Sequence, residues 1–235
     1  PLRQMNGHAT FNEVFLTDAR VPAANVVGDV GGGWPVALTT LAHERGLATG
    51  RVFAVAFGTG EGRCAREAAA EAGEYLKTYQ WYPQRAGRPD LVRAQATETG
   101  RDRDPSVRQQ VAALHALDRV SRWNAERARA ARAQGRPPGP EGSLAKLTGS
   151  EIARRAAVVH GRIAGAHGML AGPDSPASGV VAEVLVSVPA QSIAGGTDEV
   201  QHNIIGERVL GLPKEPGTDA DVPFRHVRTN PTGDA

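Results

Sequence analysis

The sequence predicts a mainly α protein, a four-helix-bundle-type domain preceded by a short remnant of β-structure. Three observations lead to this prediction: long segments with apolar residues at helical spacing, breaks rich in glycine and proline between them, and a first segment that alternates instead. We expect residues 1–30 to be the remnant of a β-domain and residues 31–212 to be the helical bundle domain. Residues 213–235 are rich in Asp, Thr, Pro and Gly, which is typical of a disordered tail.

The elements follow from local signals along the chain. Residues Phe11–Leu16 alternate roughly and contain β-forming side chains, which predicts a strand. Pro105 suits the first position of a helix, and Gly211 suits the position after one. The predicted helices are Trp34–Lys77, Asp90–Thr99, Pro105–Gln134, Glu141–His167, Gly179–Val188 and Asp198–Leu210.

Composition excludes several classes of function. The 27 Lys and Arg nearly balance the 25 Asp and Glu, so global charge argues against a nucleic-acid partner. Cys64 is the single cysteine, which rules out an internal disulfide and a thiolate metal cluster and fits a cytoplasmic location. No apolar run has the length of a membrane span, and the histidines lack metal-ligand spacing. The start at Pro1, without an initiator Met, suggests a truncated chain or a fragment.

Glu44 lies on the apolar stripe of the first predicted helix. The stripe passes through Leu41 and Ala48 in steps of three or four residues, and no residue at helical distance from Glu44 is cationic. A carboxylate on an apolar face tends to have a raised pKa, which suits a general base. Periodicity equally allows a Glu at the edge of the stripe that pairs with an Arg of another helix.

A second candidate site is the segment Ser192–Gln201. Gly195 and Gly196 lead into a helix whose first turn offers free backbone N–H groups, which can bind a phosphate or a flavin oxygen. The structural alternative is an ordinary helix cap, since Asp198 and Glu199 already complement that helix end. The arginine-rich stretch between residues 119 and 136 is interpreted as a solvated helix face that could also touch phosphates.

Taken together, four motifs resemble the acyl-CoA dehydrogenase family. The first of the four comprises Phe11-Asn12-Glu13-Val14-Phe15 and the following Asp18-Ala19-Arg20-Val21-Pro22, and the others are Gly33-Trp34, His43-Glu44-Arg45 and the block from Gly195 to Gly211. The resemblance implies the end of the family's central β-domain followed by its carboxy-terminal helical bundle. It also implies FAD as cofactor and α,β-dehydrogenation of an acyl-CoA thioester, with a carboxylate removing the α-proton while a β-hydride passes to flavin N5.

The resemblance assigns the catalytic base. The family places this Glu either before the glycine-threonine pair of the final motif or early in the first bundle helix. Gly195 occupies the first position here and cannot act as a base, whereas Glu44 stands directly before an Arg at the second. Glu44 is therefore the expected catalytic residue, and Leu41, Arg45, Gly195 and Gly196 are the expected substrate-site residues.

The resemblance also implies FAD contacts. Thr197 and Glu199 match positions near the flavin, and Gln109 matches a glutamine that contacts FAD bound mainly to a neighbouring subunit. The family's arginine-phenylalanine-glycine motif is missing, and Arg101 stands near its place as a possible substitute. The family's glutamine-x-x-glycine-glycine pattern corresponds here to residues 162–166. Three of them are candidates for cofactor contacts: Arg162 in place of the glutamine, and Gly165 and Ala166 in place of the two glycines.

The expected function is an FAD-dependent acyl-CoA dehydrogenase, present as a carboxy-terminal portion that is not active alone. The expected partners are an acyl-CoA, an electron acceptor that is either a flavoprotein or oxygen, and further subunits in a homodimer, homotetramer or hetero-oligomer. An acyl-CoA oxidase of the same fold, a non-catalytic partner subunit and a DNA-binding relative of the family are the alternatives. Glu44 at a catalytic position favours the two enzymes.

Overall fold

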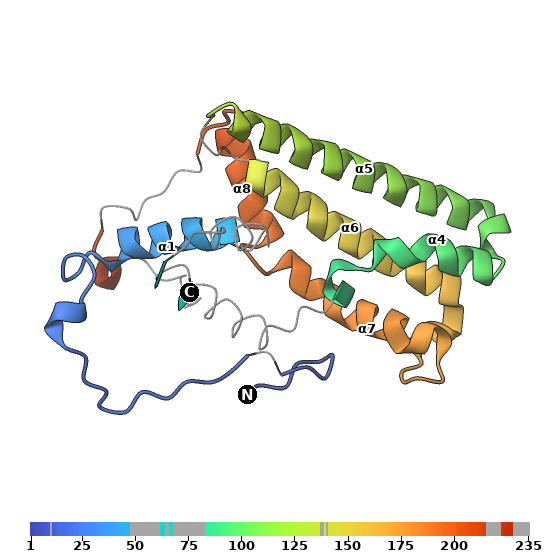
Figure 1. The fold of residues 1–235 in the computed structure, drawn as a ribbon, viewed down its shortest axis with the longest axis horizontal. Coiled ribbons are helices and arrows are strands. Elements are labelled where there is room, and N and C mark those ends of the chain that lie inside the picture. The colour runs from blue at the N-terminus through green and yellow to red at the C-terminus, as the bar shows by residue number, and fades with distance from the viewer. Residues whose placement is uncertain are drawn as a thin grey trace, which may run out of the picture.

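The mainly α prediction is confirmed by a computed structural model of the chain (Figure 1). The structure describes residues 1–9, 11–47, 62–63, 66–67, 83–136, 139, 141–214 and 222–227. Its labelled helices are α1 (Gly33–Leu47), α4 (Pro89–Glu98), α5 (Pro105–Ala133), α6 (Glu141–Ala164), α7 (Val180–Ser187) and α8 (Asp198–Arg208). Short 3-10 turns connect several of these helices.

Helix α6 is the centre of the packed bundle, because α4, α5, α7 and α8 all contact it. Figure 1 shows α5 and α6 side by side and antiparallel, with α8 crossing near the beginning of α6. Helix α1 is drawn apart from this packed group in the same view. Helix α6 is therefore the element to which the other helices of the packed bundle are attached.

The core lies on two neighbouring faces of α6. One face packs against α4 and α5, and the other packs against α7 and the 3-10 turn that follows it. The first cluster consists of Val92, Ala96, Val107, Leu114, Ile152, Ala156, Val159 and Ile163. The second consists of Ala153, Ala157, Val184 and Val188. Burial on two sides explains why α6 carries apolar side chains on more than a single stripe.

Helix α5 begins as the sequence indicates. The carboxylate of Asp104 accepts hydrogen bonds from the backbone N–H groups of Ser106 (2.8 Å) and Val107 (3.4 Å), and Pro105 occupies the first helical position. This cap satisfies donors that the helix itself leaves without partners. It ends the short 3-10 turn Arg101–Arg103 and sets the direction of α5.

The predicted strand Phe11–Leu16 is wrong. Within the described residues, the β-pairing of this region is one antiparallel bridge between Leu2 and Phe11. The side chains of Phe15 and Leu16 are strongly exposed, and no described residue pairs with residues 12–16 as a strand. Alternation and β-propensity favour a strand only when a paired partner is available, because an isolated strand leaves its backbone donors and acceptors unmatched.

The amino-terminal turn is nevertheless attached to the bundle. The His8 Nε2 and Glu183 Oε1 atoms are 2.8 Å apart, and the Asn6 side chain donates to Ser187 Oγ at 3.0 Å. Both partners belong to α7. Residues far apart in the sequence are thus joined at this end of the bundle.

Several predicted boundaries differ from the observed ones. The helix predicted over Trp34–Lys77 begins as α1, and most of its predicted length beyond Leu47 lies outside the described residues. Helix α6 ends at Ala164 and continues as the 3-10 turn Gly165–Met169, because Gly165 adopts a left-handed φ of 56° that an α-helix cannot continue through. The tail is described only over residues 222–227. The three domain ranges stay a prediction.

A buried histidine joins the segment before α4 to α6. His160 is fully buried; its Nε2 lies 3.1 Å from the Gly87 carbonyl and 3.0 Å from the Arg88 carbonyl, and its Nδ1 lies 2.5 Å from the Gln95 side-chain amide. Because the two backbone carbonyls only accept hydrogen bonds, Nε2 carries a hydrogen. In the neutral ring Nδ1 is then an acceptor, so the Gln95 amide must present its NH2 group to Nδ1. Burial lowers the pKa of His160, which favours this neutral form.

Candidate functional site

The diglycine segment forms a tight turn before α8. Gly195 and Gly196 adopt φ angles of 69° and 91°, which other residues rarely adopt. A Cβ on Gly196 would lie 2.7 Å from the Gln201 side-chain nitrogen, which donates to the Gly195 carbonyl at 3.1 Å. A Cβ on Gly195, by contrast, would meet no described atom within 4 Å. Among the described residues, the turn is therefore closed on its Gly196 side and open on its Gly195 side.

Asp198 does not serve as the cap of α8, contrary to the simple interpretation of the sequence. Thr197 is the N-cap, and its hydroxyl accepts from the Val200 N–H at 3.3 Å. The buried carboxylate of Asp198 instead accepts from Lys146 Nζ and from an Arg154 guanidinium nitrogen, both at 2.7 Å. Sequence spacing could not show this, because both cations lie more than 40 residues earlier in the chain.

Three side chains of α6 form this attachment, and we call Lys146, Ser150 and Arg154 the α6 row. They are spaced four residues apart, which places them along one face of the helix. Lys146 Nζ lies 3.3 Å from the Ser192 carbonyl, and the Ser150 hydroxyl donates to the Gln191 carbonyl at 2.9 Å. The row was not predicted from the sequence. The signal that could have found it is the repeat of polar residues at every fourth position of a predicted helix.

We expect the Asp198 ion pair to stabilise the fold in a pH-dependent way. Burial alone raises the pKa of this carboxyl, but the Lys146 ammonium group, together with the nearby hydroxyl groups of Ser150 and Ser192, outweighs burial and lowers the pKa from 3.8 to about 2. Since the folded pKa lies below the unfolded one, the stabilisation is complete above about pH 4 and is lost as the pH falls toward 2. It amounts to no more than about 2 kcal/mol.

Urea unfolding in steps from about pH 5 to pH 2 measures this contribution. The free energy of unfolding should fall with pH in the wild type and fall less steeply in Asp198→Asn, which has no carboxyl to titrate. Equal slopes in the two proteins would contradict the assignment of the low pKa to Asp198.

A second group of predicted cofactor residues lies where α5 begins and α6 ends. Arg162 is exposed in the last turn of α6 and donates to Ser106 Oγ at 3.0 Å, which joins the two helix ends. Gln109 is exposed on the second turn of α5. Arg101 is exposed in the 3-10 turn before α5, and the exposed Gly165 and Ala166 follow Arg162 closely.

The structure separates this group from the diglycine segment with its neighbours Thr197 and Glu199. Ser150, at the middle of the α6 row, and Arg162 are 12 residues apart on one helix. At the rise of an α-helix this is about 18 Å. Glu199 is exposed, and its pKa is lowered, first by its own backbone N–H and then by the Thr197 hydroxyl. The predicted cofactor residues therefore form two separate groups in one chain.

The third group lies on α1. Leu41, Glu44 and Arg45 fall in the last two turns of this helix. The Leu41 side chain is 45% exposed, so its part of the predicted apolar stripe is not packed into the core. The side chains of residues 42–47 lie outside the described part, so the role of Glu44 as base stays a prediction.

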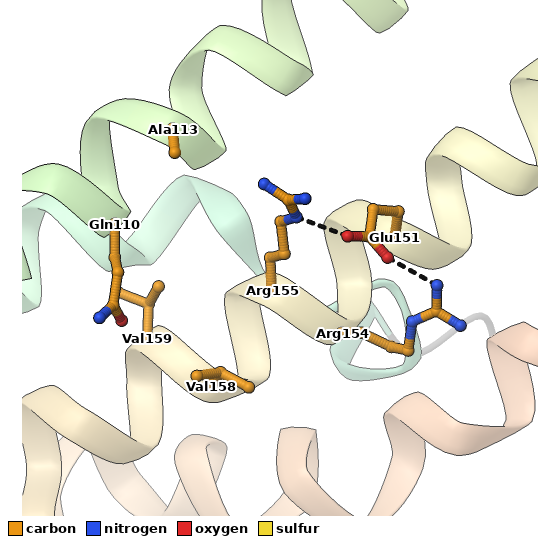
Figure 2. A pocket seen from close by; sticks show the side chains of 7 residues that line it. All are labelled: Gln110, Ala113, Glu151, Arg154, Arg155, Val158 and Val159. Atoms are coloured by element: carbon orange, nitrogen blue, oxygen red, sulfur yellow. Dashed lines mark hydrogen bonds and ion pairs between the residues drawn. The ribbon is translucent and has the colours of Figure 1, made fainter.

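A shallow groove of about 260 Å³ runs between α5 and α6 (Figure 2). Figure 2 shows Glu151 between two guanidinium groups, with Arg154 and Arg155 each 2.6 Å from one of its oxygens. The groove is lined by Gln110, Ala113, Glu151, Arg154, Arg155, Val158 and Val159. Arg154 thus takes part in both the groove and the α6 row.

The described residues contain neither a metal site nor a helix that could span a membrane. No group of three or more His, Cys, Asp or Glu side chains there could hold a metal ion. None of the described helices combines the length and apolar character needed to cross a membrane.

The family follows from comparison with known proteins. Residues 90–210, which include most of α4 and all of α5 to α8, match the family described as Acyl-CoA dehydrogenase, C-terminal domain. This chain belongs to the acyl-CoA dehydrogenase family. The matched residues contain the α6 row and the diglycine segment but not α1.

Curated relatives match over most of the chain. Acyl-CoA dehydrogenase IpdE1 of Mycobacterium tuberculosis (strain ATCC 25618 / H37Rv) is 32% identical over 223 residues, which cover 92% of this chain and 47% of that protein. The protein of the same name from Mycolicibacterium smegmatis (strain ATCC 700084 / mc(2)155) is 30% identical over 219 residues, covering 92% and 46%. The chain therefore spans about half the length of these relatives.

A solved structure shows the same fold. The structure titled "Tcur3481-Tcur3483 steroid ACAD" matches with a TM-score of 0.59 and 21% identity, covering 92% of this chain and 48% of that one. At this identity the likeness concerns the fold alone. It agrees with the mainly α architecture described above.

Proposed function

We propose that this chain supplies the carboxy-terminal half of an FAD-dependent acyl-CoA dehydrogenase. In this proposal Glu44 removes the α-proton of the acyl-CoA, and the flavin accepts the β-hydride. Leu41, Arg45, Gly195 and Gly196 line the substrate. The observation that carries the proposal is the anchored diglycine turn, which is attached to α6 yet open on the Gly195 side.

The open side of Gly195 supports Glu44 as the base. The family can place its carboxylate at the position of Gly195, and here no described atom lies within 4 Å of where a Cβ would stand. The space beside Gly195 is thus available to a carboxylate that comes from another element. α1 carries Glu44, and in the view of Figure 1 its carboxy-terminal end points toward α8.

The residues also fit the requirements of a bound FAD. Thr197 and Glu199 lie at the start of α8, where backbone N–H groups favour a phosphate or a flavin oxygen. Arg101 and Arg162 provide exposed guanidinium groups at the other end of α6, and guanidinium groups suit phosphate oxygens. When bound, FAD would accept the hydride. This chain's residues would hold its polar groups and keep them in place.

The separation of about 18 Å between these groups supports a shared cofactor site. We propose that Thr197 and Glu199 contact the FAD of their own subunit, and that Arg101, Gln109, Arg162, Gly165 and Ala166 contact the FAD of a neighbour. The active form is then a dimer or a larger assembly. It is built from identical subunits or from two different ones, as the paired name Tcur3481-Tcur3483 indicates for that protein.

A non-catalytic partner subunit is the second candidate. The specific observation in its favour is the paired name of the similar solved structure, Tcur3481-Tcur3483, which fits an assembly of two different subunits. Such a subunit would lend cofactor contacts to its neighbour and would not itself oxidise a substrate. A dehydrogenase and an oxidase differ in whether a flavoprotein or oxygen reoxidises the flavin.

The test is anaerobic flavin bleaching by the complete enzyme that contains this chain. We expect the protein to purify with FAD and its visible absorbance to fall on mixing with one member of an acyl-CoA panel. The panel should include straight-chain and steroid-derived thioesters, since the similar structure is titled a steroid enzyme. Bound FAD that no acyl-CoA bleaches would favour the partner subunit, and reoxidation in air without a flavoprotein would identify an oxidase.

A further inference from the structure

The α6 row holds the diglycine segment on both sides of its turn. Before the turn, Lys146 and Ser150 contact the backbone carbonyls of Ser192 and Gln191. After the turn, Lys146 and Arg154 contact the carboxylate of Asp198. Both ends of the segment are thus fixed to one rigid helix, which limits the conformations that the glycines between them can adopt.

The attachment is electrostatic and largely shielded from water. The Lys146 and Asp198 side chains are 15% and 7% exposed, whereas Arg154 is 45% exposed. Breaking a shielded ion pair leaves an uncompensated charge, so its loss has a larger effect than loss of a pair at the surface. Lys146, which also reaches the Ser192 carbonyl, should therefore contribute more than Arg154.

We propose that Lys146 and Arg154 are positioning residues, which act through Asp198 to set the place of Gly195, Gly196 and Thr197 relative to the bundle. The effect of these residues on turnover rests on the proposed dehydrogenation, whereas their effect on the turn does not. Neither cation needs to touch substrate or cofactor. A misplacement of about 1 Å at a reacting centre can reduce turnover about a hundredfold, so a loosened turn lowers the rate even when the cofactor stays bound.

Hydrogen–deuterium exchange tests the structural part in the complete enzyme. In Lys146→Met, whose side chain can follow the path of the lysine stem, the amides of residues 192–197 should exchange roughly tenfold faster than in the wild type. Lys146→Arg keeps the charge and should restore most of the protection. Arg122→Met is the matched control, because Arg122 forms a separate ion pair with Asp118 on α5. Unchanged exchange in Lys146→Met would overturn the proposal.

Turnover tests the functional part. Lys146→Met should keep its FAD absorbance and lose about tenfold to a hundredfold in kcat, with a smaller change in KM, and Arg154→Met should lose less. If Lys146→Met does not fold, the neutral pair Lys146→Gln with Asp198→Asn replaces it, and this pair should be less impaired than Asp198→Asn alone. Wild-type kcat in Lys146→Met, or no coupling between the two positions, would contradict positioning.

The two proposals fail in different ways. If no acyl-CoA bleaches the wild-type flavin, the proposed dehydrogenation is wrong, and the exchange result still decides whether the α6 row holds the turn. If the wild type is active and the exchange of residues 192–197 is insensitive to Lys146, the dehydrogenation stands and the positioning role is wrong.

Discussion

Glu44→Gln should abolish most acyl-CoA-dependent flavin bleaching while FAD remains bound. Glutamine keeps the size of the side chain and its hydrogen bonding but cannot accept the α-proton. Removal of a general base typically lowers the rate by about two to four powers of ten, and a weakly acidic carbon makes the loss larger. The measurement is the anaerobic bleaching rate of the complete enzyme with its best acyl-CoA.

A second variant separates the loss of a base from other damage at Glu44. Glu44→Thr combined with Gly195→Glu moves the carboxylate to the family's other position and should restore part of the activity. The site has room for it, since no described atom lies within 4 Å of a Cβ on Gly195. The φ of 69° at this position costs a non-glycine residue about 1–2 kcal/mol, so the restoration should be incomplete. Wild-type bleaching in Glu44→Gln would instead favour the non-catalytic partner subunit.

Gly87→Ala should be the most destabilising of the small substitutions in the bundle. A Cβ there would lie 2.7 Å from both the Cα and the carbonyl oxygen of Ala153 and 3.0 Å from the Ala156 Cβ. These atoms belong to the backbone and core of α6 and cannot move aside as a flexible side chain could. Gly87 also has a φ of 83°. The free energy of unfolding should fall by about 2–4 kcal/mol, measured by urea denaturation.

Gly100→Ala is the matched control for that substitution. Gly100 has a φ of 68°, and a methyl group added to it would meet no described atom within 4 Å, so the variant carries the conformational cost without the clash. We expect a loss of about 1 kcal/mol. Equal losses in the two variants would show that the contact between Gly87 and α6 does not hold this loop in place.

The carboxy-terminal motif illustrates what can be inferred before the tertiary structure. Gly195 and Gly196 could be expected to form a turn, because consecutive glycines before a helix indicate positive φ angles, and both angles are positive. The helix cap could not be assigned in the same way. Asp198, Glu199 and Thr197 are all chemically suitable. The structure places Thr197 at the N-cap, while Asp198 is the first helical residue and its carboxylate pairs with Lys146 and Arg154.

The strand at Phe11–Leu16 illustrates the opposite case. Its side-chain pattern suits a half-buried strand, but pairing requires a neighbouring strand, and the described residues provide a single bridge at Phe11. The loop before α4 had no role that could be assigned from its sequence. Its attachment to His160 and to the backbone of Ala153 became apparent only with α6 packed against it.

The sequence by itself determined the family, the order of the helices, the start of α5 at Pro105 and the choice of Glu44 over Gly195 as the expected base. These features depend on residue type and on neighbours within a few positions, which periodicity and motifs record. Only the tertiary structure decided that α6 is central, that Asp198 pairs with the α6 row, and that the predicted cofactor residues form two separate groups. The Asp198 ion pairs and the Arg162–Ser106 contact join residues more than 40 positions apart. The four-residue spacing of the α6 row indicates a shared helix face but does not say which distant residue that face meets.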